Sequence, residues 1–230
     1  MRFLLDGFSQ IRPISLREQV VEQIRTAIIE GRLKPNDHIV ETSLTEQLGV
    51  SRTPVREALI LLEREGLVVA APHRGCFVRA FTVEDVDNIF SMRIALENFA
   101  GERIINELSE IDYDHLEHLM ETQRKAIVAK DFKRVRSIDM NFHQYLIQRS
   151  EHPLLMRSWQ ELVAQIAALL YIRADAIPTY DEFLAIKDHE AIVHAYKKRD
   201  LDDLRAQNYR INTRVANECR FAVEKLDKNT

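Results

Sequence analysis

The chain has 230 residues, of which 46% are hydrophobic and 30% are charged, and its formal net charge at pH 7 is −4. This length and balance predict one large or two small globular domains and exclude a disordered or fibrous chain, while the mild negative charge gives no overall sign of nucleic-acid binding. The longest uncharged apolar run, residues 166–172, is too short to cross a bilayer, and the first residues lack a signal-peptide pattern. We therefore expect a cytoplasmic protein without membrane contact.

The distribution of glycine and proline divides the chain into two modules. Five of the six glycines and four of the six prolines lie in the first 80 residues, whereas the rest of the chain reads as long helices with few sharp turns. We predict one domain over residues 9–80 and a second over residues 81–230. Cys76 and Cys219 lie far apart without a CxxC spacing, which predicts reduced thiols rather than a disulfide framework or a thiolate zinc site.

Helical spacing of apolar residues, together with capping and turn residues, predicts three helices in the first module. They run from Ser15 or Leu16 to Gly31, from an N-cap at Thr42 or Ser43 to Gly49, and from an N-cap at Ser51 to Gly66. The tight turn between the second and third helices has helix-turn-helix spacing. Residues 67–70 and 76–79 are short β-prone runs around a turn that contains proline and glycine, and they predict a hairpin wing.

The N-terminal end of the third helix carries the side chains best placed to contact DNA. Outside the apolar stripe it presents Ser51, Arg52, Thr53 and Arg56, and the two arginines lie one helical turn apart. In a helix-turn-helix these positions meet base edges in the major groove, where arginine can donate two hydrogen bonds to guanine. The alternative is that Arg52 and Arg56 are ordinary solvated charges, since helix-turn-helix topology also occurs without DNA binding.

Three motifs follow one another in this module: GVSRTPVREAL at 49–59, EGLV at 65–68 and PHRGCFV at 72–78. With them, the module resembles the winged-helix domain of GntR-family transcription regulators. The resemblance implies base or phosphate contacts from Ser51, Arg52, Thr53 and Arg56. It also implies that a wing tip formed by His73, Arg74 and Gly75 enters the adjacent minor groove.

From Thr82 onward the chain reads as helices separated by polar breaks. Thr82 caps an acidic first turn of a helix that continues to about Leu108. Five further helices are predicted over residues 112–130, 132–150, 153–174, 179–199 and 201–226. The predicted fold class is therefore mainly α, with an N-terminal winged helix-turn-helix followed by an all-α six-helix bundle.

Three polar residues lie on otherwise apolar helix faces of this bundle. Asp139 and His143 are one turn apart at the border of a buried stripe, within reach of one metal ion or of each other. His189 falls on the inward side of a later helix. A hydrogen-bonded core histidine and an exposed Asp/His pair are the more common arrangements, so these residues alone favour a structural role over a metal site.

The motifs DMNFH at 139–143 and DHEAI at 188–192 lie in this all-helical second domain. In these features the domain resembles the FCD effector domain of the FadR subfamily, in particular its six-helix VanR-like group. The resemblance implies a small organic-acid effector beside a divalent metal ion, zinc or similar, held by one aspartate and three histidines. Asp139, His143 and His189 match three of these ligands.

The fourth metal ligand of the resemblance is missing, because Ile211 stands where the pattern has histidine. Asn208 and Asn212 are nearby, but amide oxygen is a weaker zinc ligand than imidazole. Either three ligands hold a more open metal, or the effector binds without metal. Arg93 resembles the cation that pairs with the effector carboxylate, and the alternative is an arginine with a buried stem and a solvated head.

Two other classes of function were weighed. A di-iron enzyme needs paired Glu-x-x-His motifs and a phosphohydrolase of the His-Asp type needs that dipeptide; the sequence contains neither. We therefore expect no enzyme, and the remaining alternative is a protein interaction module without DNA binding. The sequence predicts a homodimeric transcription regulator, expected to be a repressor, that binds double-stranded operator DNA under control of the organic acid.

Overall fold

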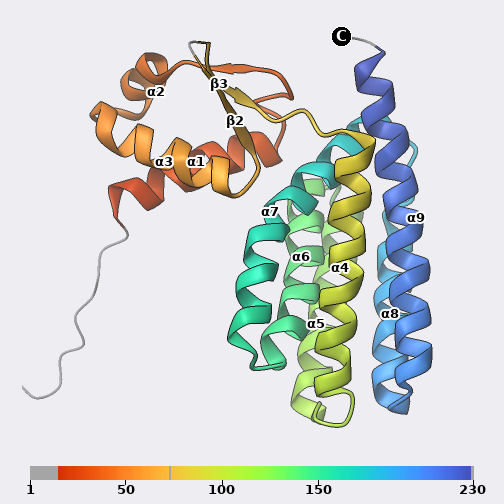
Figure 1. Cartoon of the computed structure of the whole chain (residues 1–230). Helices are drawn as coiled ribbons and strands as arrows, with labels where there is room; N and C mark the ends of the chain where they lie inside the picture. Colours follow the sequence, from red (N-terminus) through yellow and green to blue (C-terminus); the bar gives the residue numbers. More distant parts are fainter. Residues whose placement is uncertain (1–14, 73, 229–230) are drawn as a thin grey trace, which may run out of the picture.

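The computed structural model describes residues 15–72 and 74–228. In these residues the elements follow in the order α1 (Leu16–Ile29), β1 (His38–Ile39), α2 (Glu41–Leu48), α3 (Arg52–Arg64), β2 (Val68–Ala71), β3 (Gly75–Val78), α4 (Val83–Ile104), α5 (Glu110–Val128), α6 (Phe132–Arg149), α7 (Pro153–Ala176), α8 (Phe183–Lys198) and α9 (Leu201–Asp227). A small mixed domain is thus followed by a bundle of long helices, which confirms the predicted fold class (Figure 1). Residues 9–14 of the predicted first domain lie outside the described residues.

Side-chain capping is present at the start of α1 but absent at the starts of α2 and α3. Ser15 and Glu18 form a capping box at the start of α1, and Gly49 ends α2 with a left-handed backbone, as predicted. The predicted N-cap at Thr42 or Ser43 is wrong, because α2 begins at Glu41. The backbone N–H of Leu44 donates to the Val40 carbonyl at 3.1 Å, so the first turn closes earlier without a side-chain cap.

The wing is the predicted antiparallel hairpin of β2 and β3, with Val68 opposite Val78 and Ala71 opposite Gly75. The other edge of β3 pairs with β1, which gives the strand order β1-β3-β2. The sequence did not predict β1 as a strand, because two residues are too few to show an alternating pattern. The sheet therefore connects the segment after α1 to the wing.

The helices of the bundle agree with the predicted ranges to within a few residues. The largest differences, about four residues, are at the end of α4, which stops at Ile104, and at the start of α8, which begins at Phe183 after a turn. α4 and α9 lie side by side and antiparallel, joined near opposite ends by the ion pairs Asp87–Arg220 and Glu102–Arg205 (Figure 1). No helix in the described part of the chain is long and apolar enough to cross a membrane.

The small domain contacts the bundle through α7 and the start of α6. The aromatic ring of Tyr171 on α7 lies directly over Gly31, which follows α1 and has a φ of +68°. Lys133 on α6 forms an ion pair with Glu30. In the connection between the domains, Arg79 Nη1 donates to Gln165 Oε1 on α7 at 3.4 Å. The end of α1 is therefore held against two helices of the bundle.

We expect Gly31→Ala to destabilise the protein more than Gly49→Ala. Both glycines have a left-handed backbone, with φ of +68° and +64°, so an alanine costs about 1–2 kcal/mol at either position. A Cβ at Gly31 would lie 1.9 Å from Cζ and Oη of Tyr171, whereas a Cβ at Gly49 meets nothing within 4 Å. Urea unfolding measures the difference, and Tyr171→Ala should reduce the extra cost of Gly31→Ala. Equal losses at the two glycines would contradict this account of the domain contact.

Candidate nucleic-acid interface and ligand cavity

The N-terminal end of α3 presents its polar side chains to solvent. Ser51, Arg52, Thr53 and Arg56 are all exposed, and Ser51 is the N-cap residue without a side-chain capping bond. Arg56 donates from Nε to Glu41 Oε2 at 2.8 Å, an exposed pair that a phosphate could replace at small cost. These positions are therefore available to a ligand, although their predicted contacts to DNA stay predictions.

The tip of the wing has two of its three predicted residues in the described part of the chain. Arg74 and Gly75 are exposed, and His73 lies outside the described residues. The Arg74 guanidinium lies 5.9 Å from the centre of the Phe77 ring of β3, and the His38 ring of β1 stacks on the same Phe77 ring with 4.8 Å between centres. The base of the wing is thus packed while its tip faces solvent.

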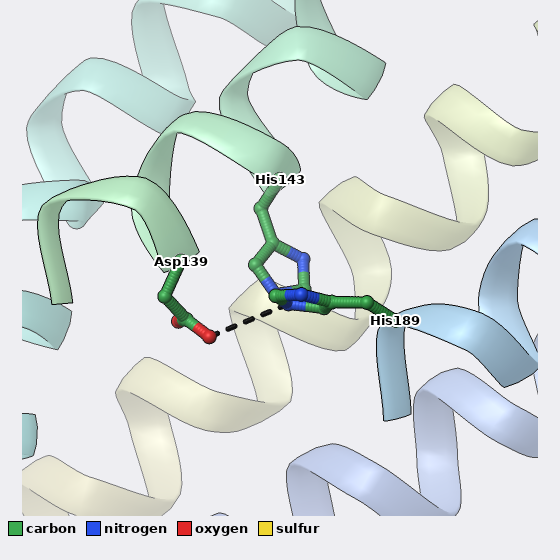
Figure 2. Close-up of side chains that lie close together, drawn as sticks. All are labelled: Asp139, His143 and His189. Carbon is green, nitrogen blue, oxygen red and sulfur yellow. Dashed lines mark hydrogen bonds and ion pairs between the residues drawn. The ribbon is translucent and has the colours of Figure 1, made fainter. Parts of the chain in front are cut away.

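In the bundle, α6 and α8 bring three chemically related side chains together. Asp139 and His143 extend from α6 toward His189 of α8 (Figure 2). His189 Nε2 lies 3.3 Å from Asp139 Oδ1 and 3.4 Å from His143 Nε2. Phe142 stacks on the His189 ring at 3.9 Å between centres and fixes its orientation. Both histidines are buried, so this is a polar cluster inside the bundle.

The cluster fits the requirements of a divalent metal ion in most respects. Two ligand atoms bound at about 2.1 Å to one tetrahedral ion lie about 3.4 Å apart, which matches both separations at His189 Nε2. All three ligand atoms lie within 4.8 Å of one another. One carboxylate and two imidazoles are a common donor set for zinc. The buried His189 Nδ1 has no hydrogen-bond partner among the described residues, so support for that ring is incomplete.

Glu97 on α4 fixes the tautomer of His143. Its Oε1 accepts from His143 Nδ1 at 2.9 Å and from Arg93 Nε at 2.9 Å, and both side chains are buried. Burial by itself raises the pKa of Glu97, but Arg93 and His143 lower it to about 2. Burial and Arg93 lower the pKa of His143. In its neutral form the imidazole therefore carries its proton on Nδ1 and directs its Nε2 lone pair toward the cluster.

The α9 residues named from the sequence lie on two sides of this cluster. Ile211 lines the cavity next to the cluster, so an apolar side chain occupies the place of the further histidine. Asn212 Nδ2 donates to Glu97 Oε2 at 2.8 Å, and its buried Oδ1 has no partner among the described residues. Asn208 Nδ2 donates to Asn98 Oδ1 at 2.9 Å. The two asparagines thus support α4 rather than extend the cluster.

The cluster lines a small cavity of about 40 Å³ that is partly open to solvent. Besides the cluster and apolar side chains, the lining contains four arginines and two further carboxylates: Arg93, Arg136, Arg173, Arg214, Glu182 and Asp188. Arginines are the most numerous charged side chains of the lining, and Arg136 among them has no ion pair within the described residues, so the cavity offers a free cation to an anionic ligand. Of the arginines, sequence reasoning named Arg93 alone.

The cavity residues that the sequence did not point to differ in how predictable they were. Glu97 follows Arg93 by one turn on the same inward face, and that spacing alone could have identified it as a buried partner. Arg136, Arg173 and Arg214 lie on three different helices, and their convergence depends on how those helices pack. No local pattern could have grouped them.

Comparison with known proteins decides the family. The family model for bacterial regulatory proteins of the gntR family matches residues 16–78, and the model for the FCD domain matches residues 88–212. The chain belongs to the GntR family and carries an FCD domain. Both families are families of transcription regulators, so the chain is a transcription regulator and not an enzyme.

Curated relatives and solved structures agree with this family. The uncharacterized HTH-type transcriptional regulator YdhC of Bacillus subtilis is 32% identical over 85% of this chain and 87% of its own length. The HTH-type transcriptional repressor RspR of Escherichia coli is 29% identical over 84% of this chain and 85% of its own length. The structure of E. coli McbR/YncC has 26% identity and a TM-score of 0.76, and covers 88% of this chain and 95% of its own.

We expect Glu97→Gln to destabilise this GntR-family protein by about 3–5 kcal/mol, because it leaves the buried Arg93 without a counter-charge. Glu102→Gln on the same helix removes an exposed pair with Arg205 and should cost less than about 1 kcal/mol. Urea unfolding, followed by fluorescence of the buried Trp159, compares the two variants. Equal costs would show that the buried pair does not hold the bundle together.

Proposed function

We propose that this GntR-family regulator is a cytoplasmic repressor whose operator binding is controlled by a small organic acid and a divalent metal ion in the bundle. The observation that carries the proposal is the arginine-rich cavity, which contains the Asp139, His143 and His189 cluster and lies in the same chain as a winged helix. RspR, a relative by sequence, is named as a repressor. Another relative, 28% identical, is the gluconate operon transcriptional repressor of Bacillus subtilis.

The DNA-binding part of the proposal places α3 in the major groove of the operator. Arg52 and Arg56 would donate to base edges and phosphates, and Ser51 and Thr53 would contact phosphates or bases. A wing tip of His73, Arg74 and Gly75 would reach the adjacent minor groove. The exposure of the α3 residues and of Arg74 and Gly75 supports this arrangement.

The effector part of the proposal concerns the cavity. Asp139, His143 and His189 would hold a divalent ion such as zinc, which when bound supplies a Lewis-acidic centre for an effector carboxylate. Arg93 lines the same cavity and would add positive charge beside the bound acid. Asn208 and Asn212 stay predicted effector contacts; neither lines this cavity, and both donate to side chains of α4.

Operator recognition is proposed to require a homodimer that presents two winged helices to two half-sites. The exposed side of α4 supports this arrangement. Met92 and Phe99 lie seven residues apart on this helix, with 47% and 41% exposure. Self-association over this face would bury them.

Arg52→Ala should lose about 1–3 kcal/mol of discrimination at one base pair of the operator. The test measures fluorescence anisotropy with a duplex recovered from genomic DNA by the protein, together with single-base variants of that duplex. Arg64→Ala is the matched control, because Arg64 is exposed at the opposite end of α3. Base discrimination that survives Arg52→Ala unchanged would refute the proposed role of Arg52.

Tag-free protein should bind about one zinc ion per chain, as measured by calorimetric titration and elemental analysis. Losing an outer-shell partner alone costs about 10–100-fold in metal affinity, so His143→Ala should cost at least as much. His194→Ala is the control, since His194 is exposed on α8 away from the cluster. Ile211→His should tighten zinc binding by supplying the further imidazole. Zinc affinity that is indifferent to both His143→Ala and Ile211→His would contradict the metal site.

A further inference from the structure

The four arginines of the cavity differ in their partners. Three of them are paired with carboxylates: Arg93 with Glu97 at 2.9 Å, Arg173 with Glu218 at 3.2 Å, and Arg214 with Glu218 at 2.7 Å and with Asp188. Arg136 has no ion pair or hydrogen bond from its side chain among the described residues. Its guanidinium instead lies over the Tyr171 ring, whose centre is 5.7 Å from the guanidinium carbon. Arg136 is thus the cation of the cavity that still lacks an anion.

Without a bound anion, the charged guanidinium of Arg136 is poorly stabilised by its surroundings. The side chain is partly buried, and burial lowers its pKa, which means that the charged form is poorly solvated. Glu182 lines the same cavity and stabilises the charge from a distance, beyond ion-pair contact. An anion bound directly to the guanidinium would form charge-assisted hydrogen bonds that the protein itself does not supply.

We propose that Arg136 binds a second anionic group of the effector, so that the cavity selects acids with two such groups over monocarboxylates. The inference rests on the proposed function, in which the first carboxylate lies near Asp139, His143 and His189. Arg136 precedes Asp139 by three residues on α6, which is about 4.5 Å along the helix axis. A short dicarboxylate is long enough to reach from one position to the other.

The position of Arg136 also connects ligand binding to the DNA-binding domain. A second hollow lies between α1 and the helices α6 and α7, with Glu22, Arg25 and Glu30 on its α1 side. Among the described residues, Arg136 alone lines both this hollow and the ligand cavity. An anion that draws the guanidinium into the cavity therefore removes positive charge from a wall that faces acidic residues of α1.

The test compares malonate with acetate as probes, by calorimetric titration of the full-length protein with and without bound zinc. Wild-type protein should bind malonate more tightly than acetate. Arg136→Gln should lower malonate affinity about tenfold or more, as expected for a lost charge-assisted contact, and should leave acetate affinity unchanged. The malonate affinity of Arg136→Lys should lie between those of wild-type protein and Arg136→Gln. Glu182→Gln removes the competing carboxylate and should raise malonate affinity.

Arg134→Gln is the matched control, because Arg134 is exposed on the same helix and should not affect either acid. The melting temperature of each variant without acid verifies folding. Equal malonate affinity in Arg136→Gln and Arg134→Gln would overturn the inference while leaving the proposed function intact, as would equal binding of malonate and acetate by wild-type protein. If neither acid binds wild-type protein and neither alters its operator affinity, the proposed organic-acid control fails as well.

Discussion

The ligand cavity depends on the hydrogen bonds made by the buried carboxylate of Glu97. This carboxylate accepts hydrogen bonds from Arg93 on its own helix, from His143 on α6 and from Asn212 on α9. A charge inside a bundle is tolerated when its partners satisfy it, so these contacts fix α4, α6 and α9 in one arrangement. The same carboxylate sets the tautomer of His143 and directs the Nε2 lone pair of that ring toward Asp139 and His189. Glu97 therefore both holds the three helices together and sets the chemistry of the cluster.

Two helices connect that site to the DNA-binding domain. α6 carries Asp139 and His143 in its middle and Lys133, the partner of Glu30, in its first turn. α7 contributes Tyr171, which covers the end of α1 at Gly31. Because a helix shifts as a unit, a displacement of α6 on ligand binding would act on the end of α1 directly. The link is short, and the hollow beside it leaves space for such a movement.

The sequence predicted the helices well and the cavity only in part, for physical reasons. Long helices with capping residues and periodic apolar faces are specified locally, as at Ser15 and Thr82, where both capping boxes are present. The three residues of the cluster carry a spacing signal, since Asp139 and His143 are one turn apart. The cationic lining has none, because Arg136, Arg173 and Arg214 come from separate helices and meet only through packing. The two-residue strand β1 was missed for a related reason: its partner, β3, is distant in sequence.

The central claim is that an anion in the cavity changes how the DNA-binding domain is held against α6 and α7. Hydrogen exchange of the full-length, zinc-loaded protein with and without malonate tests it most directly, because exchange reports local opening segment by segment. The account predicts altered exchange in the cavity helices and also in α1 and the segment around Gly31, where the domains meet. Altered exchange confined to the cavity, with α1 unchanged while operator affinity responds to malonate, would contradict it.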